Sequence, residues 1–125
     1  MENLIDKGSS ARPAGLLAWQ YAAYLDNHHD HTNLALHAAT VPLFMLGNVA
    51  LLAAPFVNLW LLPAGALASF FAIALQGRGH AREAQAPAPF RGPADVFARI
   101  LAEQWITFPR FVWSGGFARA LRGGS

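Results

Sequence analysis

Three histidines lie near the ends of a long stretch of the chain, residues 31–77, that contains no Asp, Glu, Lys or Arg. His28 and His37 are close to its beginning, and His80 follows its end. If this stretch folds as a hairpin of two apolar helices, its ends return to one side and the three imidazoles meet there. Imidazole is a frequent ligand of zinc and iron, so the pattern favours a metal site where an apolar hairpin reaches water.

His28 and His37 can bind one metal ion only if the chain bends between them. In one straight helix they would be about 13.5 Å apart along the axis, whereas a ligand nitrogen lies about 2.0–2.1 Å from the metal. Residues 26–33 are rich in turn-forming and capping types, and they predict a helix end followed by a new helix capped by Thr32 or Asn33. Asn33, four residues before His37, is also placed to orient that ring.

A carboxylate and three polar residues complete the candidate site. His80 and Glu83 are three residues apart, so they share one face of a helical turn, as do the ligands of iron and manganese in helical bundles. Three imidazoles with one carboxylate suit Fe(II), with Zn(II) and Mn(II) as alternatives. The candidate residues for substrate binding are Tyr24, Asn33 and Arg78.

The same residues also have a plainer explanation. An isolated histidine near an apolar face is more often hydrogen-bonded than metal-bound, and arginines such as Arg78 commonly anchor a helix at a membrane boundary. His29 and His31 continue no stripe of apolar residues, and we expect them in a solvated loop. The alternative function is therefore a small non-catalytic membrane adaptor whose histidines are interfacial or bind a structural metal. Haem ligated by two histidines is a third alternative.

Composition places the chain among membrane proteins. It has 125 residues, of which 54% are hydrophobic and only 13% charged, against a usual charged share of about 25%. The net charge of +2, with acids interspersed, argues against a nucleic-acid partner. Without cysteine there is no disulfide, thiolate nucleophile or cysteine-ligated metal. The expected partner is the lipid bilayer, the inner membrane in a bacterium or the endoplasmic reticulum in a eukaryote.

We therefore expect one all-α, membrane-embedded domain spanning residues 1–125. An apolar hairpin over residues 34–76 is flanked by an N-terminal helix and a C-terminal amphipathic helix, and its return helix, from about residue 61, is short for a full span. Residues 1–12 are expected to be flexible. The amphipathic helix covers residues 94–113, with Arg99 and Glu103 paired four residues apart on its polar side.

Two groups of residues resemble a known family, the 2-hydroxy-fatty-acid dioxygenases, over about residues 19–115. The second group is shorter and less specific than the first, and the segment from Glu103 to Phe111 extends the resemblance. The matching residues are Tyr24-Leu25-x2-His28-x3-Thr32-Asn33-x-Ala35-Leu36-His37 and, after the hairpin, Gly79-His80-x2-Glu83 followed by Pro87.

The resemblance implies an Fe(II)-dependent α-oxidation, in which a 2-hydroxy fatty acid and O2 give a fatty acid one carbon shorter. The residues that resemble the essential histidines of the family are His28, His37 and His80. In eukaryotic members the acid and the following proline lie one position further from the histidine than Glu83 does. Glu83 is therefore a metal ligand, a hydrogen-bond partner of one, or neither. The acyl chain is expected to lie in the hairpin.

Overall fold

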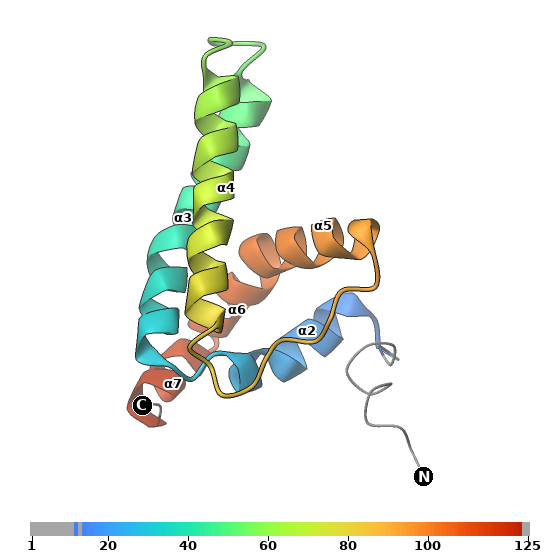
Figure 1. The fold of residues 1–125 in the computed structure, drawn as a ribbon, viewed down its shortest axis with the longest axis vertical. Helices are drawn as coiled ribbons and strands as arrows, with labels where there is room; N and C mark the ends of the chain where they lie inside the picture. Colours follow the sequence, from blue (N-terminus) through green and yellow to red (C-terminus); the bar gives the residue numbers. More distant parts are fainter. Residues whose placement is uncertain (1–11, 13, 124–125) are drawn as a thin grey trace.

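A tall helical hairpin stands on a base of shorter helices (Figure 1). The computed structural model describes residues 12 and 14–123, and every regular element in this part of the chain is helical. The predicted all-α fold with a helical hairpin is confirmed. The prediction of a flexible N-terminus falls on residues 1–12, of which only Arg12 is described. The elements are α2 (Leu16–Tyr24), η1 (Leu25–Asn27), α3 (His31–Ala53), α4 (Leu61–His80), α5 (Pro93–Ala102), η2 (Glu103–Thr107), α6 (Phe108–Trp113) and α7 (Gly116–Gly123).

The two helices of the hairpin are longer than the sequence pattern predicts. α3 begins at His31 because the Asp30 side chain accepts a hydrogen bond from the Asn33 amide at 2.9 Å, so the cap is Asp30 and not Thr32 or Asn33. α4 continues four residues beyond the expected end, to His80. With 23 and 20 residues, both helices are long and apolar enough to cross a membrane.

α3 and α4 pack closely because glycines face each other between them. A Cβ atom on Gly65 would lie 2.5 Å from the carbonyl oxygen of Gly47, and one on Gly47 would lie 2.5 Å from the Ser69 hydroxyl. The side-chain amide of Asn48 donates a hydrogen bond to the Ser69 hydroxyl at 3.0 Å. Small residues and an interhelical hydrogen bond are the usual means of helix association in lipid. This packing leaves no room for an acyl chain at that level of the hairpin, where we expected one.

A Gly65→Leu variant should lose this close approach. The new side chain meets backbone rather than a movable side chain, so we expect a destabilisation of about 1–3 kcal/mol, typical of overpacking. Gly77→Ala is the matched control, because nothing lies within 4 Å of a Cβ atom there, and it should stabilise α4 by about 0.5–1 kcal/mol. Thermal unfolding in detergent measures both. Equal melting temperatures for Gly65→Leu and the unmodified protein would contradict the packing.

The predicted amphipathic helix over residues 94–113 is present as α5, η2 and α6. Its apolar side chains face outward in α5, whereas both phenylalanines of α6 are buried in the core. Phe97 is 70% exposed and Leu101 47%, whereas Arg99 is buried. Arg99 pairs with Asp95, at 3.7 Å, rather than with Glu103 as expected. Glu103 is thus left to face the interior of the base.

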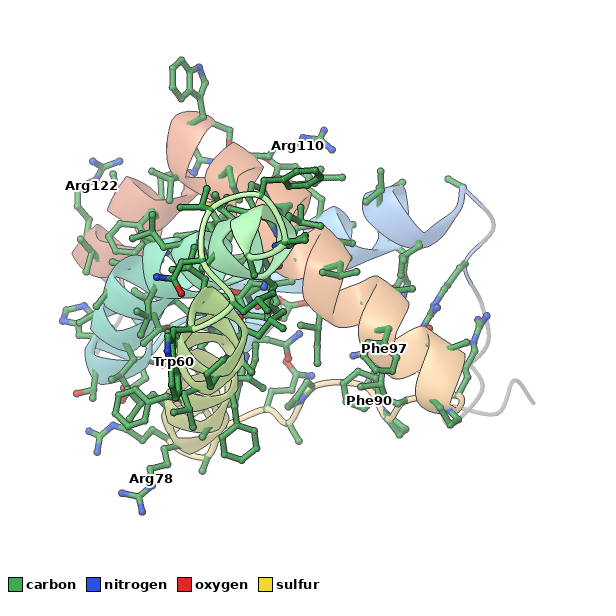
Figure 2. All side chains as sticks on the ribbon, turned by 90° about the horizontal axis from the view of Figure 1, so that it is seen from above. Trp60, Arg78, Phe90, Phe97, Arg110 and Arg122 are labelled. Carbon is green, nitrogen blue, oxygen red and sulfur yellow. The ribbon has the colours of Figure 1, made fainter. Side chains whose placement is uncertain are left out.

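Apolar side chains are also exposed on the hairpin and on the turn at its tip. Phe56, Trp60 and Phe70 are each more than 70% exposed, and Figure 2 shows Trp60 in the view from above the hairpin. Monomers in water rarely expose contiguous apolar surface of this kind, whereas a surface in contact with lipid requires it. The hairpin and α5 therefore both expose apolar side chains on their outer surfaces.

The chain between α5 and α6 widens into the π-helical turn η2 just before Pro109. The ring of a proline in a regular helix clashes with the carbonyl four residues earlier. Here the amide of Phe108 instead bonds the carbonyl of Glu103, five residues earlier. π-helical turns occur frequently at functional sites, and this one begins at Glu103.

Candidate metal centre

His28 reaches the interior because α2 ends just before it. The 3₁₀ turn η1 follows α2, and His28 then leaves helical geometry with φ −138° and ψ 65°. Its Nδ1 lies 2.8 Å from the Tyr24 carbonyl oxygen, and its ring stacks on the Tyr24 ring at a centroid distance of 3.7 Å. The bend that the sequence predicts between His28 and His37 is thus made by η1 and the break before α3.

His37 lies in the second turn of α3, fully buried, and is held in the same way as His28. Its Nδ1 lies 3.0 Å from the carbonyl oxygen of Asn33. A carbonyl only accepts hydrogen bonds, so Nδ1 carries a proton in both rings and Nε2 is the nitrogen left to face the centre. The two Nε2 atoms are 3.4 Å apart. Such backbone anchoring of the other nitrogen is typical of metal-binding histidines.

His80, the last residue of α4, is brought to this place by the antiparallel hairpin. Its ring centroid lies 4.8 Å from that of His28 and 4.9 Å from that of His37, with interplanar angles of 78° and 84°. The three rings thus meet edge-on around one point. The Nδ1 atom of His80 is buried and has no hydrogen-bond partner in the described part of the chain, which calls for an explanation because such atoms are costly.

Glu103 is the fourth member of the group. Its Oε2 atom lies 3.5 Å from Nε2 of His28 and 3.4 Å from Nε2 of His37. Burial raises the pKa of Glu103, but contacts with the His28 and His37 imidazoles outweigh burial and hold the pKa well below its usual range. Glu103 is therefore a carboxylate at neutral pH.

Tyr24 holds the Glu103 carboxylate in place. The Tyr24 hydroxyl donates to Oε2 of Glu103 at 2.8 Å. Burial and the nearby carboxylate raise the pKa of Tyr24 well above its usual value, so the phenol keeps the proton it donates. Tyr24, predicted to bind substrate, is thus found supporting both His28 and Glu103.

The geometry of the four side chains fits a metal ion. One donor atom from each of them lies within 4.8 Å of the others. Two donors at about 2.1 Å from a metal and at a tetrahedral angle are about 3.4 Å apart, which matches the shortest separations here. A cation bound here would also lie beside the His80 ring. Three imidazoles and a carboxylate suit Fe(II), Mn(II) and Zn(II).

The structure places Glu83 outside this group. Its carboxylate accepts hydrogen bonds from the His29 amide at 2.9 Å, the Asp30 amide at 3.0 Å and the Asn33 side chain at 2.7 Å. It lies in the turn after α4, because the helix ends at His80. Glu83 therefore ties the end of α4 to the turn before α3.

The remaining candidates lie around the centre rather than in it. Asn33 holds the His37 ring through its backbone carbonyl, while its side chain binds Glu83. Arg78 points outward (Figure 2) and does not line the cavity beside the centre. His29 and His31 are exposed.

Sequence reasoning missed Glu103 because it was paired with Arg99. Asp95 and Arg99 are also four residues apart, and this second possible pair was the available signal. Once Arg99 is paired with Asp95, Glu103 has no basic residue of its own helix to pair with. The π-helical turn η2 also changes the direction in which the Glu103 side chain points, and the spacing of residues in the sequence does not predict that change.

A cavity of about 640 Å³ opens beside the candidate centre, within the usual range of ligand pockets. His28, His80 and Glu103 form part of its wall. The cavity lies between α2, the end of α4, α5 and the segment 81–92, which runs alongside α2 in Figure 1. Its position differs from the interior of the hairpin, where we expected the substrate.

Replacing Tyr24 by phenylalanine should weaken metal binding without disrupting the fold. The variant keeps the stacking on His28 but loses the hydrogen bond to Glu103, and loss of such a supporting bond costs about 10–100-fold in metal affinity. We expect a value near the lower limit, measured by anaerobic Fe(II) titration. Tyr21→Phe is the control, since Tyr21 bonds the exposed Ser114 hydroxyl. Equal affinities in the two variants would show that Tyr24 does not support the centre.

Comparison with known proteins supports the resemblance noted in the sequence. The family model described as 2-hydroxy-palmitic acid dioxygenase Mpo1-like matches residues 16–108. No curated protein and no solved structure matches the chain. The matched range covers most of the chain and contains all four side chains of the candidate centre. The chain therefore belongs to the 2-hydroxy-palmitic acid dioxygenase Mpo1-like family.

Proposed function

We propose that this protein is an Fe(II)-dependent dioxygenase that shortens 2-hydroxy fatty acids by one carbon through α-oxidation. The observation that carries the proposal is the convergence of His28, His37, His80 and Glu103 on one point in the wall of a cavity. The family to which the chain belongs is described by the same substrate class and reaction type. The substrates are a 2-hydroxy fatty acid and O2, and the products are the fatty acid one carbon shorter, CO2 formed from C1, and water.

The residues of the centre prepare the site for a cation. His28 and His37 direct their Nε2 atoms toward the centre, because their Nδ1 atoms are held by backbone carbonyls. Glu103 brings one negative charge, and Tyr24 fixes its orientation. Bound Fe(II) would supply redox chemistry toward O2 and coordination for the hydroxyl and carboxylate oxygens of the substrate.

The surrounding cavity completes the requirements for this reaction. A 2-hydroxy acid held by its polar end presents the bond between C1 and C2 to the centre, which is the bond that α-oxidation breaks. The apolar remainder of the substrate needs a site that excludes water. The His28 and His37 rings, each held by a backbone carbonyl, reduce the motion that would otherwise misplace the reacting carbon.

We also propose that the protein is integral to a membrane, the inner membrane in a bacterium or the endoplasmic reticulum in a eukaryote. Two helices have the length and composition for a span, and the outward side of α5 is apolar as well. A 2-hydroxy fatty acid, which is poorly soluble in water, would be dissolved in the same lipid bilayer. This arrangement places the candidate centre at the base of the hairpin.

The alternative function, a non-catalytic adaptor with a structural metal, makes a different experimental prediction. It retains metal binding at the same four residues but gives no turnover. Haem is disfavoured by geometry, since the Nε2 atoms of His28 and His37 are 3.4 Å apart and their rings stand at 87°. That separation leaves no space for a porphyrin plane between them.

The test is a turnover assay on anaerobically purified protein in detergent or lipid. After addition of Fe(II), 2-hydroxyhexadecanoic acid and O2, we expect pentadecanoic acid as the product, measured by mass spectrometry. Hexadecanoic acid, which lacks the hydroxyl group, should remain unchanged. Iron binding without any pentadecanoic acid would favour the adaptor and overturn the enzymatic proposal.

A further inference from the structure

The cavity beside the candidate metal centre extends away from it along α2. Its wall includes both His28 and Trp19. The C-terminal part of α2 and the 3₁₀ turn η1 separate these two residues, which corresponds to roughly 14 Å. Across from α2 the wall is formed by the segment 81–92 and by α5, which lie on either side of the same space. The cavity is therefore elongated, with the centre at one end.

The wall between these ends is made mainly of small or apolar side chains. Such residues leave width for an unbranched chain and offer it no hydrogen bonds. They come from all four segments around the cavity. The set includes Ala23, Ile73, Ala84, Ala86, Ala88 and Ile100.

The amide side chains in the wall have partners within the protein. Gln20 donates to the Arg99 carbonyl and accepts from the Thr107 hydroxyl. Gln76 exchanges hydrogen bonds with Gln104, at 2.9 and 2.7 Å. An apolar ligand can therefore pass these groups without leaving a buried polar atom unpaired, which would be costly.

A cluster of two aromatic rings and a guanidinium closes the end of the cavity remote from the centre. The Arg99 Cζ atom lies 4.2 Å from the Phe90 ring centroid and 5.1 Å from that of Trp19. Arg99 is in turn fixed by the Pro89 carbonyl, at 3.1 Å, and by Asp95. We name Trp19, Phe90 and Arg99 the end wall. Side chains held by several contacts of this kind are not readily displaced by a ligand.

From this arrangement we infer that the cavity is the acyl-chain site of the 2-hydroxy fatty acid and that the end wall sets the preferred chain length. The inference rests on the proposed function. The polar end of the substrate lies at His28, His80 and Glu103, and its hydrocarbon chain runs along α2 toward Trp19 and Phe90. The acyl chain is thus held beside the hairpin and beneath the segment 81–92, not between α3 and α4.

The first test maps the site without requiring turnover. A 2-hydroxy fatty acid with a photoreactive diazirine at its terminal carbon is bound to the Fe(II)-loaded protein in lipid without O2 and irradiated. We expect labelled peptides from residues 16–28 and 84–100. Labelling confined to α3 and α4, as for any lipid around a hairpin, would overturn the assignment even if the protein proves to be a dioxygenase.

Two matched variants sharpen this test. Ala23→Trp fills the cavity between Trp19 and His28, whereas Ala22→Trp adds the same side chain on the exposed face of α2. We expect labelling of Ala23→Trp to fall at least about 10-fold and that of Ala22→Trp to stay unchanged, because overfilling a site excludes its ligand. Equal labelling of the two variants would contradict the inference.

The end wall is tested by enlarging the cavity, which also covers the case that Ala23→Trp does not fold. Phe90→Ala removes a half-exposed ring and should raise the ratio of kcat/KM for 2-hydroxyeicosanoic over 2-hydroxyhexadecanoic acid about 10-fold. Phe97→Ala, on the outer side of α5, should leave the ratio unchanged. An unchanged ratio for both variants overturns the role of the end wall. Absence of turnover in the unmodified protein would instead contradict the proposed function, with the labelling result still deciding the site.

Discussion

The His37→Ala variant is expected to lose Fe(II) affinity by more than about 100-fold and, with it, all measurable turnover. His37 is fully buried and contributes the nitrogen closest to both His28 and Glu103. Loss of a residue that merely supports a ligand costs about 10–100-fold in metal affinity, so loss of the ligand itself should cost more. Metal content after anaerobic dialysis against Fe(II), together with the turnover assay, measures the effect.

The control for His37→Ala lies on the same helix. His31 is exposed at the start of α3 and lies outside the candidate centre, so His31→Ala should keep full metal content and activity. Both variants remove one imidazole, and a nonspecific effect of histidine content would therefore appear in both. Full metal content in His37→Ala would remove His37 from the centre.

The two acidic residues near the centre should respond in opposite ways to replacement by glutamine. We expect Glu103→Gln to lower Fe(II) affinity by about 10–100-fold, because a neutral amide replaces the carboxylate that faces His28 and His37. Glu83→Gln should leave that affinity within a few-fold. Its cost should appear as stability, about 1.5–3 kcal/mol, since the carboxylate that accepts hydrogen bonds from the turn before α3 is lost.

This pair separates the structural and metal-binding roles of the acids. Anaerobic Fe(II) titration and thermal unfolding are measured on both variants under identical conditions. The reverse pattern, with affinity lost in Glu83→Gln and stability lost in Glu103→Gln, would transfer the fourth position of the centre to Glu83.

The sequence was sufficient to predict the arrangement of the hairpin and the meeting of its histidines. An uncharged stretch over residues 31–77 predicts two apolar helices, and their antiparallel return brings His80 to His37. The turn-forming residues before α3 predict the bend that turns His28 inward. Each of these predictions depends on periodicity and on local capping, which are properties of consecutive residues.

The parts that could not be predicted depend on competition between distant or equivalent contacts. Arg99 has acidic neighbours four residues away on both sides, and only the packed base shows that it pairs with Asp95 and leaves Glu103 to the histidines. Pro109 signals an irregular helix, but not that the irregularity is a π-helical turn beginning at Glu103. The close approach of Gly47 to Gly65, which keeps the cavity out of that part of the hairpin, likewise needs both helices in register.

X-ray absorption spectroscopy of the Fe(II)-loaded protein shows which side chains bind the metal. We expect multiple scattering from three imidazoles and a first shell of nitrogen and oxygen at roughly 2.0–2.2 Å, with one imidazole fewer in His37→Ala if residual iron is retained. A shell of oxygen alone, without imidazole scattering, would contradict the assignment of His28, His37 and His80 as the ligands of this centre.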